Sequence, residues 1–121
     1  MDKKGFTLIE MLIALVLLAI GLLAIAGMQL TSVKSNFFSN NLTQASIMGQ
    51  DRLEALRQLD INHADLNIGA HNEGTIGGTI FSREYTVSLV PGTTMRSIAV
   101  TVRWKEDSNH AISFSTMRAQ Q

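Results

Sequence analysis

Cysteine is absent from this 121-residue chain, and proline, tryptophan and tyrosine each occur only once. The lack of cysteine excludes a disulfide framework, a thiolate nucleophile and a zinc–thiolate cluster. An excess of one charge is also missing, because ten basic residues balance ten acidic residues. A chain with no net charge has no strong electrostatic field to attract nucleic acid, so we expect no nucleic-acid partner.

Sequence motifs that would indicate an enzyme are missing as well. No serine lies in a nucleophile-elbow sequence, and no glycine-rich phosphate loop follows a strand pattern. The spacing of His63, His71 and His110 matches no metal-ligand motif, so we interpret them as solvated loop residues. The sequence therefore predicts a protein with no enzymatic activity, no cofactor and no metal.

A long apolar run near the N-terminus is the strongest feature that the chain does have. Residues 11–28 carry no charge, and as a helix they span about 27 Å, close to the thickness of a bilayer's hydrocarbon core. Lys3 and Lys4 precede this run, and the next basic residue is Lys34. The positive-inside rule therefore predicts a cytoplasmic N-terminus and a translocated C-terminal part.

Three interpretations compete for this segment. The first is a cleavable signal peptide, since the sequence Ala24-Ile25-Ala26 is typical of a site cut after Ala26. The second is a plain membrane anchor. Neither explains Glu10, because a carboxylate in an apolar helix costs about 3 kcal/mol at the membrane centre and indicates a functional residue. The third is a cut after Gly5, which would let Glu10 pair with a neighbour's new ammonium group at Phe6.

The N-terminal residues also resemble a known family. The sequence Lys4-Gly5-Phe6-Thr7-Leu8-Ile9-Glu10, followed by the apolar run, is similar to the type III signal of type IV prepilins and type II secretion pseudopilins. The resemblance implies that a prepilin peptidase cuts after Gly5 and methylates Phe6, and that Glu10 is needed for methylation and assembly. It also implies other major and minor pilins as partners through the N-terminal helix, together with an inner-membrane assembly platform.

The apolar run narrows this resemblance. Residues 13–29 are similar to the PilV-type minor pilins, the type IV pilus modification proteins. This implies a minor pilin that primes pilus assembly or affects adhesion, located first in the bacterial inner membrane and then in a surface filament. A minor pseudopilin of a type II secretion system is the alternative. A periplasmic binding protein released by a cut after Ala26 is the remote alternative.

Beyond the apolar run the pattern becomes amphipathic. Apolar residues recur near the helical period at Leu30, Val33, Phe37, Ala45, Met48, Leu56 and Leu59. No proline interrupts this stretch, so we expect a single helix over residues 6–59, about 80 Å long. Residues 60–79 are rich in glycine and asparagine, and we interpret them as an irregular connection.

Alternating apolar and polar residues follow in three segments, around Tyr85–Leu89, Ile98–Trp104 and Ile112–Phe114. Period-two alternation is typical of half-buried strands, and the short links between them predict an antiparallel meander over residues 80–118. The predicted fold is therefore α+β and pilin-like. Its parts are a leader (1–5), a transmembrane assembly helix (6–30) and a head (31–121) whose amphipathic helix covers residues 31–59.

Overall fold

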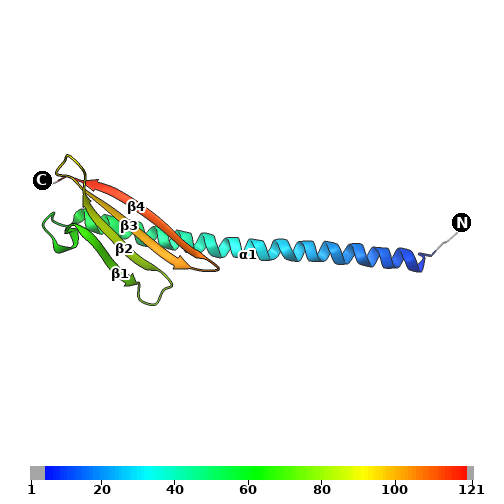
Figure 1. Ribbon diagram of the computed structural model, residues 1–121. Coiled ribbons are helices and arrows are strands. Elements are labelled where there is room, and N and C mark those ends of the chain that lie inside the picture. The colour runs from blue at the N-terminus through cyan, green and yellow to red at the C-terminus, as the bar shows by residue number, and fades with distance from the viewer. Residues whose placement is uncertain (1–4, 120–121) are drawn as a thin grey trace. The chain divides into compact units, whose positions relative to one another are not determined.

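The structure, a computed structural model, describes residues 5–119. Lys3 and Lys4, on which the predicted membrane orientation rests, lie outside the described residues. The chain folds into helix α1 (Leu8–Gln58), the short 3-10 helix η1 (Ala64–Leu66), and strands β1 (Gly69–Thr75), β2 (Ser82–Leu89), β3 (Arg96–Lys105) and β4 (Asn109–Arg118) (Figure 1). The predicted α+β class is confirmed.

Helix α1 contains 51 residues and falls within one or two residues of the predicted bounds. Its composition explains its length, because leucine, alanine and methionine favour helix and no proline interrupts it. The helical assignment continues through Gly21 and Gly27, although each glycine lowers helix propensity. Two compact units, Met1–Ser39 and Asn40–Gln121, divide the chain, and α1 contributes residues to both.

The second unit holds a four-stranded antiparallel sheet in the order β1-β2-β3-β4. The sequence Pro91-Gly92-Thr93-Thr94 lies in the link from β2 to β3, and Gly92 adopts a positive φ of 76°. The link between β3 and β4 contains only residues 106–108, because β4 begins at Asn109.

The prediction of three strands was wrong, and so was the irregular connection over residues 60–79. That segment contains η1 and the additional strand β1. The sequence of β1 shows no alternation of large apolar residues. Backbone pairing with β2, rather than burial of its own side chains, places this strand in the sheet. Its register shifts between Asn72 and Gly74, so that Glu73 is the extra residue of a β-bulge.

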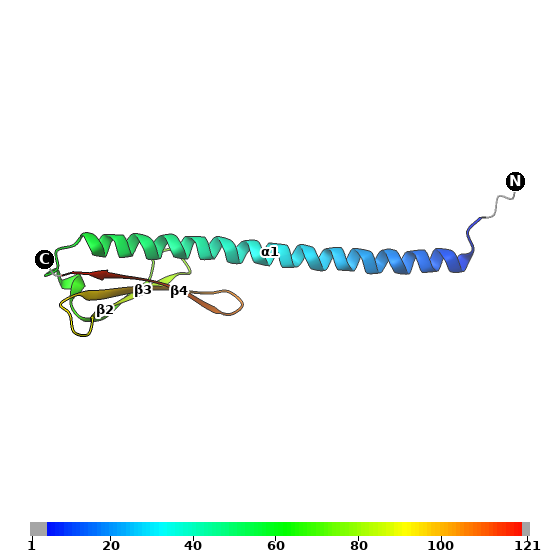
Figure 2. The ribbon, with the colours of Figure 1, turned by 90° about the horizontal axis from the view of Figure 1, so that it is seen from above.

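The core of the second unit lies between one face of the sheet and residues 40–58 of α1 (Figure 2). The helix contributes a stripe at spacings of three and four residues, formed by Leu42, Ala45, Gly49, Leu53 and Leu56. The sheet contributes alternate residues of its central strands, including Val87, Ile98, Val100, Val102 and Trp104. Trp104 is 4% exposed and belongs to this core, and the burial of these side chains stabilises the head.

Only part of the predicted apolar stripe is buried. Ala45 and Leu56 are fully buried, whereas Leu30, Val33 and Phe37 in the first unit are at least half exposed. The apolar pattern therefore identifies the helix, but it does not distinguish the part that packs against the sheet from the part that is exposed. Gly49 completes the buried stripe, because a Cβ at this position would lie 2.7 Å from the Phe114 ring. The helix can approach β4 this closely only because position 49 lacks a side chain.

Candidate functional site

Gly5, Phe6 and Thr7 precede α1 in an exposed, non-helical segment. Phe6 is 84% exposed, and a Cβ added to Gly5 would meet no atom within 4 Å. The peptide bond between Gly5 and Phe6 therefore lies outside the helix. A peptidase can reach such a bond without unfolding hydrogen-bonded structure.

Thr7 and Glu10 form a reciprocal cap at the start of α1. The Thr7 hydroxyl oxygen accepts a hydrogen bond from the Glu10 backbone N–H at 3.2 Å, and Glu10 Oε2 accepts one from the Thr7 N–H at 3.1 Å. This is a capping box, in which two backbone donors with no partner in the helix are satisfied by side chains. The first helical bond follows from Met11 N–H to the Thr7 carbonyl at 3.1 Å. The local sequence thus fixes where α1 begins.

Our interpretation of the sequence missed this local role of Glu10. The signal was present, because a threonine followed three residues later by glutamate before an apolar run is the pattern of a capping box. The acidic group also suits the first turn electrostatically, since the N-terminus of a helix carries partial positive charge. A carboxylate has two acceptor oxygens, so capping through Oε2 is compatible with a further partner at Oε1.

Residues 8–30 present an apolar surface all around the helix. Their large apolar side chains are between 52% and 77% exposed. By length and composition α1 can cross a membrane, and none of its most apolar window is buried within the described residues. Water does not solvate such a surface favourably, so we expect lipid or other helices to surround this part of α1.

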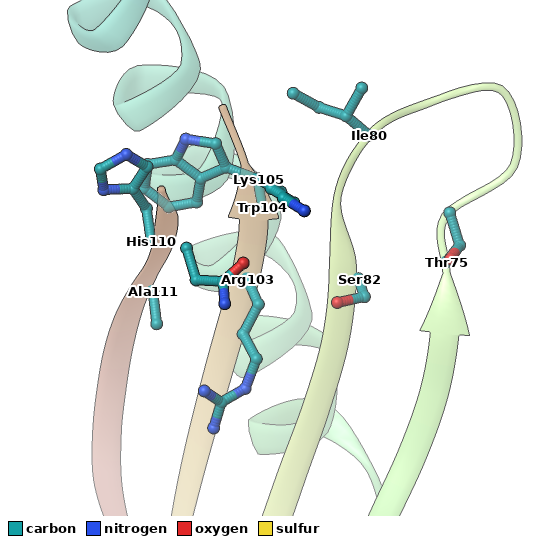
Figure 3. A pocket seen from close by; sticks show the side chains of 9 residues that line it. Thr75, Ile80, Ser82, Arg103, Trp104, Lys105, His110 and Ala111 are labelled. Carbon is teal, nitrogen blue, oxygen red and sulfur yellow. The ribbon is translucent and has the colours of Figure 1, made fainter. Parts of the chain in front are cut away.

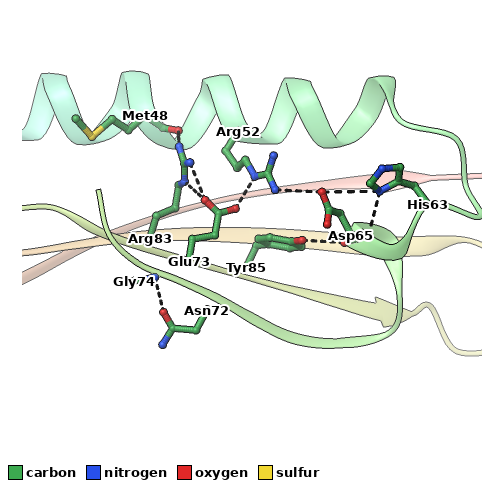
Figure 4. Close-up of polar contacts among 9 residues, drawn as sticks. All are labelled: Met48, Arg52, His63, Asp65, Asn72, Glu73, Gly74, Arg83 and Tyr85. Carbon is green, nitrogen blue, oxygen red and sulfur yellow. Dashed lines mark hydrogen bonds and ion pairs between the residues drawn. The ribbon is translucent and has the colours of Figure 1, made fainter. Parts of the chain in front are cut away.

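The head contains a network of charged side chains centred on Glu73 (Figure 4). The bulge in β1 turns Glu73 toward α1, where its carboxylate pairs with Arg52 and, at 2.6 Å, with Arg83. Arg83 also donates to the Met48 carbonyl of α1 at 3.2 Å. These contacts connect β1 and β2 to the helix. On the exposed side of the helix Glu54 pairs with Arg57 at 3.4 Å, whereas Arg52 pairs with the sheet.

Asp65 and Tyr85 extend this network. Arg52 contacts the Asp65 carboxylate at 3.5 Å, and the Tyr85 hydroxyl donates to the Asp65 carbonyl at 2.9 Å. Burial lowers the pKa of Arg52, but the hydrogen bond and charge of Glu73, together with smaller contributions from Tyr85 and Asp65, outweigh it, so the net pKa is raised. Burial, followed by the charge of Asp65, raises the pKa of Tyr85. At neutral pH the network therefore holds a charged Arg52 beside an uncharged Tyr85 hydroxyl, and both groups keep the protonation state in which they make these contacts.

The histidines differ in part from the prediction. His63 lies in the connection, where its Nδ1 accepts a hydrogen bond from the Asp65 N–H at 3.1 Å. His71 lies in β1 and stacks on Tyr85 with ring centroids 4.6 Å apart, and His110 in β4 packs against Trp104 at 5.4 Å. The loop interpretation was wrong for these two. Across residues 5–119, no group of three or more histidine or acidic side chains is placed to hold a metal ion.

A shallow pocket of about 420 Å³ lies at one end of the sheet, next to the β3–β4 turn (Figure 3). Arg103 and Lys105 bring positive charge to it, and Trp104 and His110 form one side. The guanidinium of Arg103 is already paired with Glu84 at 2.9 Å. That pairing weakens the pocket as an anion site, and its lining shows no nucleophile held by a general base.

Residues 1–26 match the family model described as the prokaryotic N-terminal methylation motif. No curated protein and no solved structure matches the chain. The matched segment contains Gly5, Phe6, the capping box and most of the apolar surface, and it ends before the head.

The match supports a precursor similar to type IV pilins or pseudopilins. Such a motif implies processing by a prepilin peptidase and assembly with other pilins in a membrane machinery. Together with the apolar helix it indicates membrane anchoring. Proteins with this motif are structural, and the long helix packed on an antiparallel sheet is the pilin-like arrangement.

Proposed function

We propose that this chain is a minor pilin of a type IV pilus. In this proposal the peptidase cuts between Gly5 and Phe6, the new amino group of Phe6 is methylated, and α1 assembles the subunit into the filament. Support comes from the methylation motif at residues 1–26, the accessible Gly5–Phe6 bond and the exposed apolar helix. The similarity of residues 13–29 to PilV-type minor pilins supports a role in priming assembly or in adhesion.

The observation that carries the proposal is a carboxylate in the first turn of an exposed apolar helix. A cut after Gly5 creates an ammonium group one residue before the helix cap Thr7. A positive charge is disfavoured there, because the N-terminus of a helix is itself positive. Pairing with the Glu10 carboxylate of a neighbouring chain offsets this cost, and in lipid no water competes with the pair. The same contact sets the register between adjacent helices.

The two alternative functions, a pseudopilin and a periplasmic binding protein, assign different roles to Thr7 and Glu10. A minor pseudopilin of a type II secretion system shares the signal and the fold, and differs only in the filament that contains it. A periplasmic binding protein cut after Ala26 would lose the capping box, and its cleavage site would fall inside α1. That alternative gives Glu10 and Thr7 no function.

Two variants of Glu10 separate its charge from its capping role. Glutamine at the third helical position still caps the helix, so Glu10→Gln removes the charge and keeps the hydrogen bond, whereas Glu10→Ala removes both. We expect both variants to insert in the membrane and both to lose about tenfold or more of their incorporation into sheared filaments. The measurement is the ratio of subunit in fibres to subunit in membranes.

Thr7→Val provides the matched control, because it removes the cap and keeps the carboxylate. Its loss of helix stability should be about 1 kcal/mol at one end of a long helix, and incorporation should stay near that of the unchanged chain. Normal incorporation of Glu10→Gln together with failure of Glu10→Ala and Thr7→Val would show that capping, not charge pairing, is the role of Glu10. That result would contradict the proposed mechanism.

A further inference from the structure

The two edges of the sheet are built differently. The β1 edge contains a bulge, two glycines at positive φ (Gly69 and Gly74) and the charged Glu73 turned toward the helix. Bulges and inward charges are the devices by which proteins keep an edge strand from pairing with another chain. The β4 edge has no bulge and no glycine at positive φ, and its one charged residue, Arg118, lies at the very end of the strand. It pairs with β3 over ten consecutive residues without a bulge, and it contains no glycine, proline or lysine.

The hairpin bonds show which backbone groups of β4 point away from the sheet. In the β3–β4 turn the Glu106 N–H donates to the Ser108 carbonyl at 3.1 Å, one step before the pair Lys105–Asn109. Hydrogen-bonded and non-bonded pairs alternate along an antiparallel ladder. The N–H and C=O groups that face the free edge therefore belong to Asn109, Ala111, Ser113, Ser115 and Met117.

The β2–β3 hairpin gives the same assignment independently. There the Val90 N–H donates to the Met95 carbonyl at 2.9 Å, which directs the N–H groups of Ser97, Ala99 and Thr101 toward β2. The intervening residues of β3 then direct theirs toward β4, in agreement with the first hairpin. The two turns thus agree on which residues of each strand direct their N–H and C=O groups to which side.

The side chains along this edge present little steric obstacle. All five residues with outward backbone groups are exposed. At the middle of the strand they are Ala111, Ser113 and Ser115, three of the smallest side chains. An extended segment can therefore approach β4 to hydrogen-bonding distance and continue the ladder.

The direction of the strands restricts the partner. Within the head α1 and β4 run the same way, since Asn41 bonds to Glu106 in the turn before β4, Gly49 approaches Phe114, and Arg118 donates to the Leu56 carbonyl. Two copies joined antiparallel through β4 would therefore have opposed helices, which does not fit insertion in one membrane. Because four strands alternate in direction, the first strand of a neighbour with a parallel helix runs antiparallel to β4.

We infer that the free edge of β4 binds an edge strand of a neighbouring pilin-like subunit, antiparallel to β4 and carried on a parallel helix. The partner is a chain of different sequence, because a second copy could offer only the bulged β1 edge. This inference rests on the proposed function, since it names a partner within the same assembly. The pairing makes the chain one-sided, with a binding edge at β4 and a blocked edge at β1.

The test is Ser113→Pro in the full-length chain, with Ser113→Ala as the matched control. Proline removes the outward N–H and its ring obstructs the incoming strand, while proline at a free edge leaves the β3–β4 bonds intact. We expect Ser113→Pro to lose about fivefold or more of its incorporation into sheared fibres. Ser113→Ala keeps the N–H and should stay within about twofold of the unchanged chain.

Hydrogen exchange on the unchanged chain covers the case in which the proline variant does not fold. The Ser113 amide should exchange fast in detergent-solubilised protein and slowly in fibres, whereas the Phe114 amide, bonded to β3, should be slow in both. Fast exchange of Ser113 in fibres, or equal incorporation of the proline and alanine variants, would overturn the inference. The Glu10 results would still stand, because they do not depend on β4.

A cysteine variant identifies the partner, since the chain has no other cysteine. Crosslinking of Ser115→Cys in fibres should give an adduct with a chain of another sequence. An adduct containing two copies of this chain would overturn the assignment of the partner.

Discussion

The two compact units of this chain differ in where their apolar side chains lie. In residues 5–39 the large apolar side chains of α1 are mostly more than half exposed. In residues 40–119 the same helix meets a sheet, and the core side chains between them, such as Leu56 and Val100, expose less than a tenth of their surface. The first region therefore depends on lipid or other helices, whereas the second supplies its own core.

This difference assigns stability and assembly to separate parts of one helix. A substitution in the second region changes how firmly the head folds. A substitution in the first region leaves the head unchanged and acts on membrane insertion or on contacts with other subunits. Trp104, the only tryptophan, lies in the core of the head and reports its unfolding alone.

The largest expected difference comes from the same substitution in the two regions. Leu56→Ala empties a fully buried position and should lower the free energy of unfolding of the head by about 2–5 kcal/mol. Leu17→Ala, at a position 64% exposed, should leave it unchanged. The measurement is denaturant unfolding of the full-length chain in detergent, followed by Trp104 fluorescence. Equal losses of unfolding free energy in the two variants would contradict the separation of the chain into a self-supporting head and an exposed assembly helix.

A smaller difference is expected from two glycines of α1. Gly49→Ala places a methyl group 2.7 Å from the Phe114 ring, and the overpacking costs about 1–3 kcal/mol. The higher helix propensity of alanine offsets about 1 kcal/mol, so the net loss of head stability should be on the order of 1 kcal/mol.

Gly27→Ala is the matched control for the close contact at Gly49. An added Cβ there meets no atom within 4 Å, and the substitution should leave head unfolding unchanged. A Gly49→Ala variant as stable as the unchanged chain would show that Phe114 moves aside at no cost, and that the close contact does not matter for the fold.

The sequence predicted the helix and the central strands because both have strong periodic patterns. Alternation from Ile98 to Trp104 identified β3 and its buried face correctly. It could not predict β1, whose glycines and polar residues are typical of a loop. That strand exists because β2 offers it backbone partners and because Arg52 and Arg83 hold Glu73, contacts between residues far apart in the sequence.

The candidate site was predictable for a different reason. Gly5, Phe6 and Glu10 lie within six consecutive residues, so their spacing is visible without any knowledge of the fold. The capping role of Thr7 was equally local and was missed only because the carboxylate had been assigned to a partner chain. The free edge of β4 could not be predicted, because it depends on which residues of each strand form the hydrogen bonds across the whole sheet.

The central claim is that the chain is a prepilin cut between Gly5 and Phe6. The most direct test is the intact mass of the protein isolated from membranes and from sheared fibres. The account predicts a mass equal to residues 6–121 plus one methyl group in both fractions. A mass beginning at Gly27 in a soluble fraction would contradict it and would make the chain an exported soluble protein.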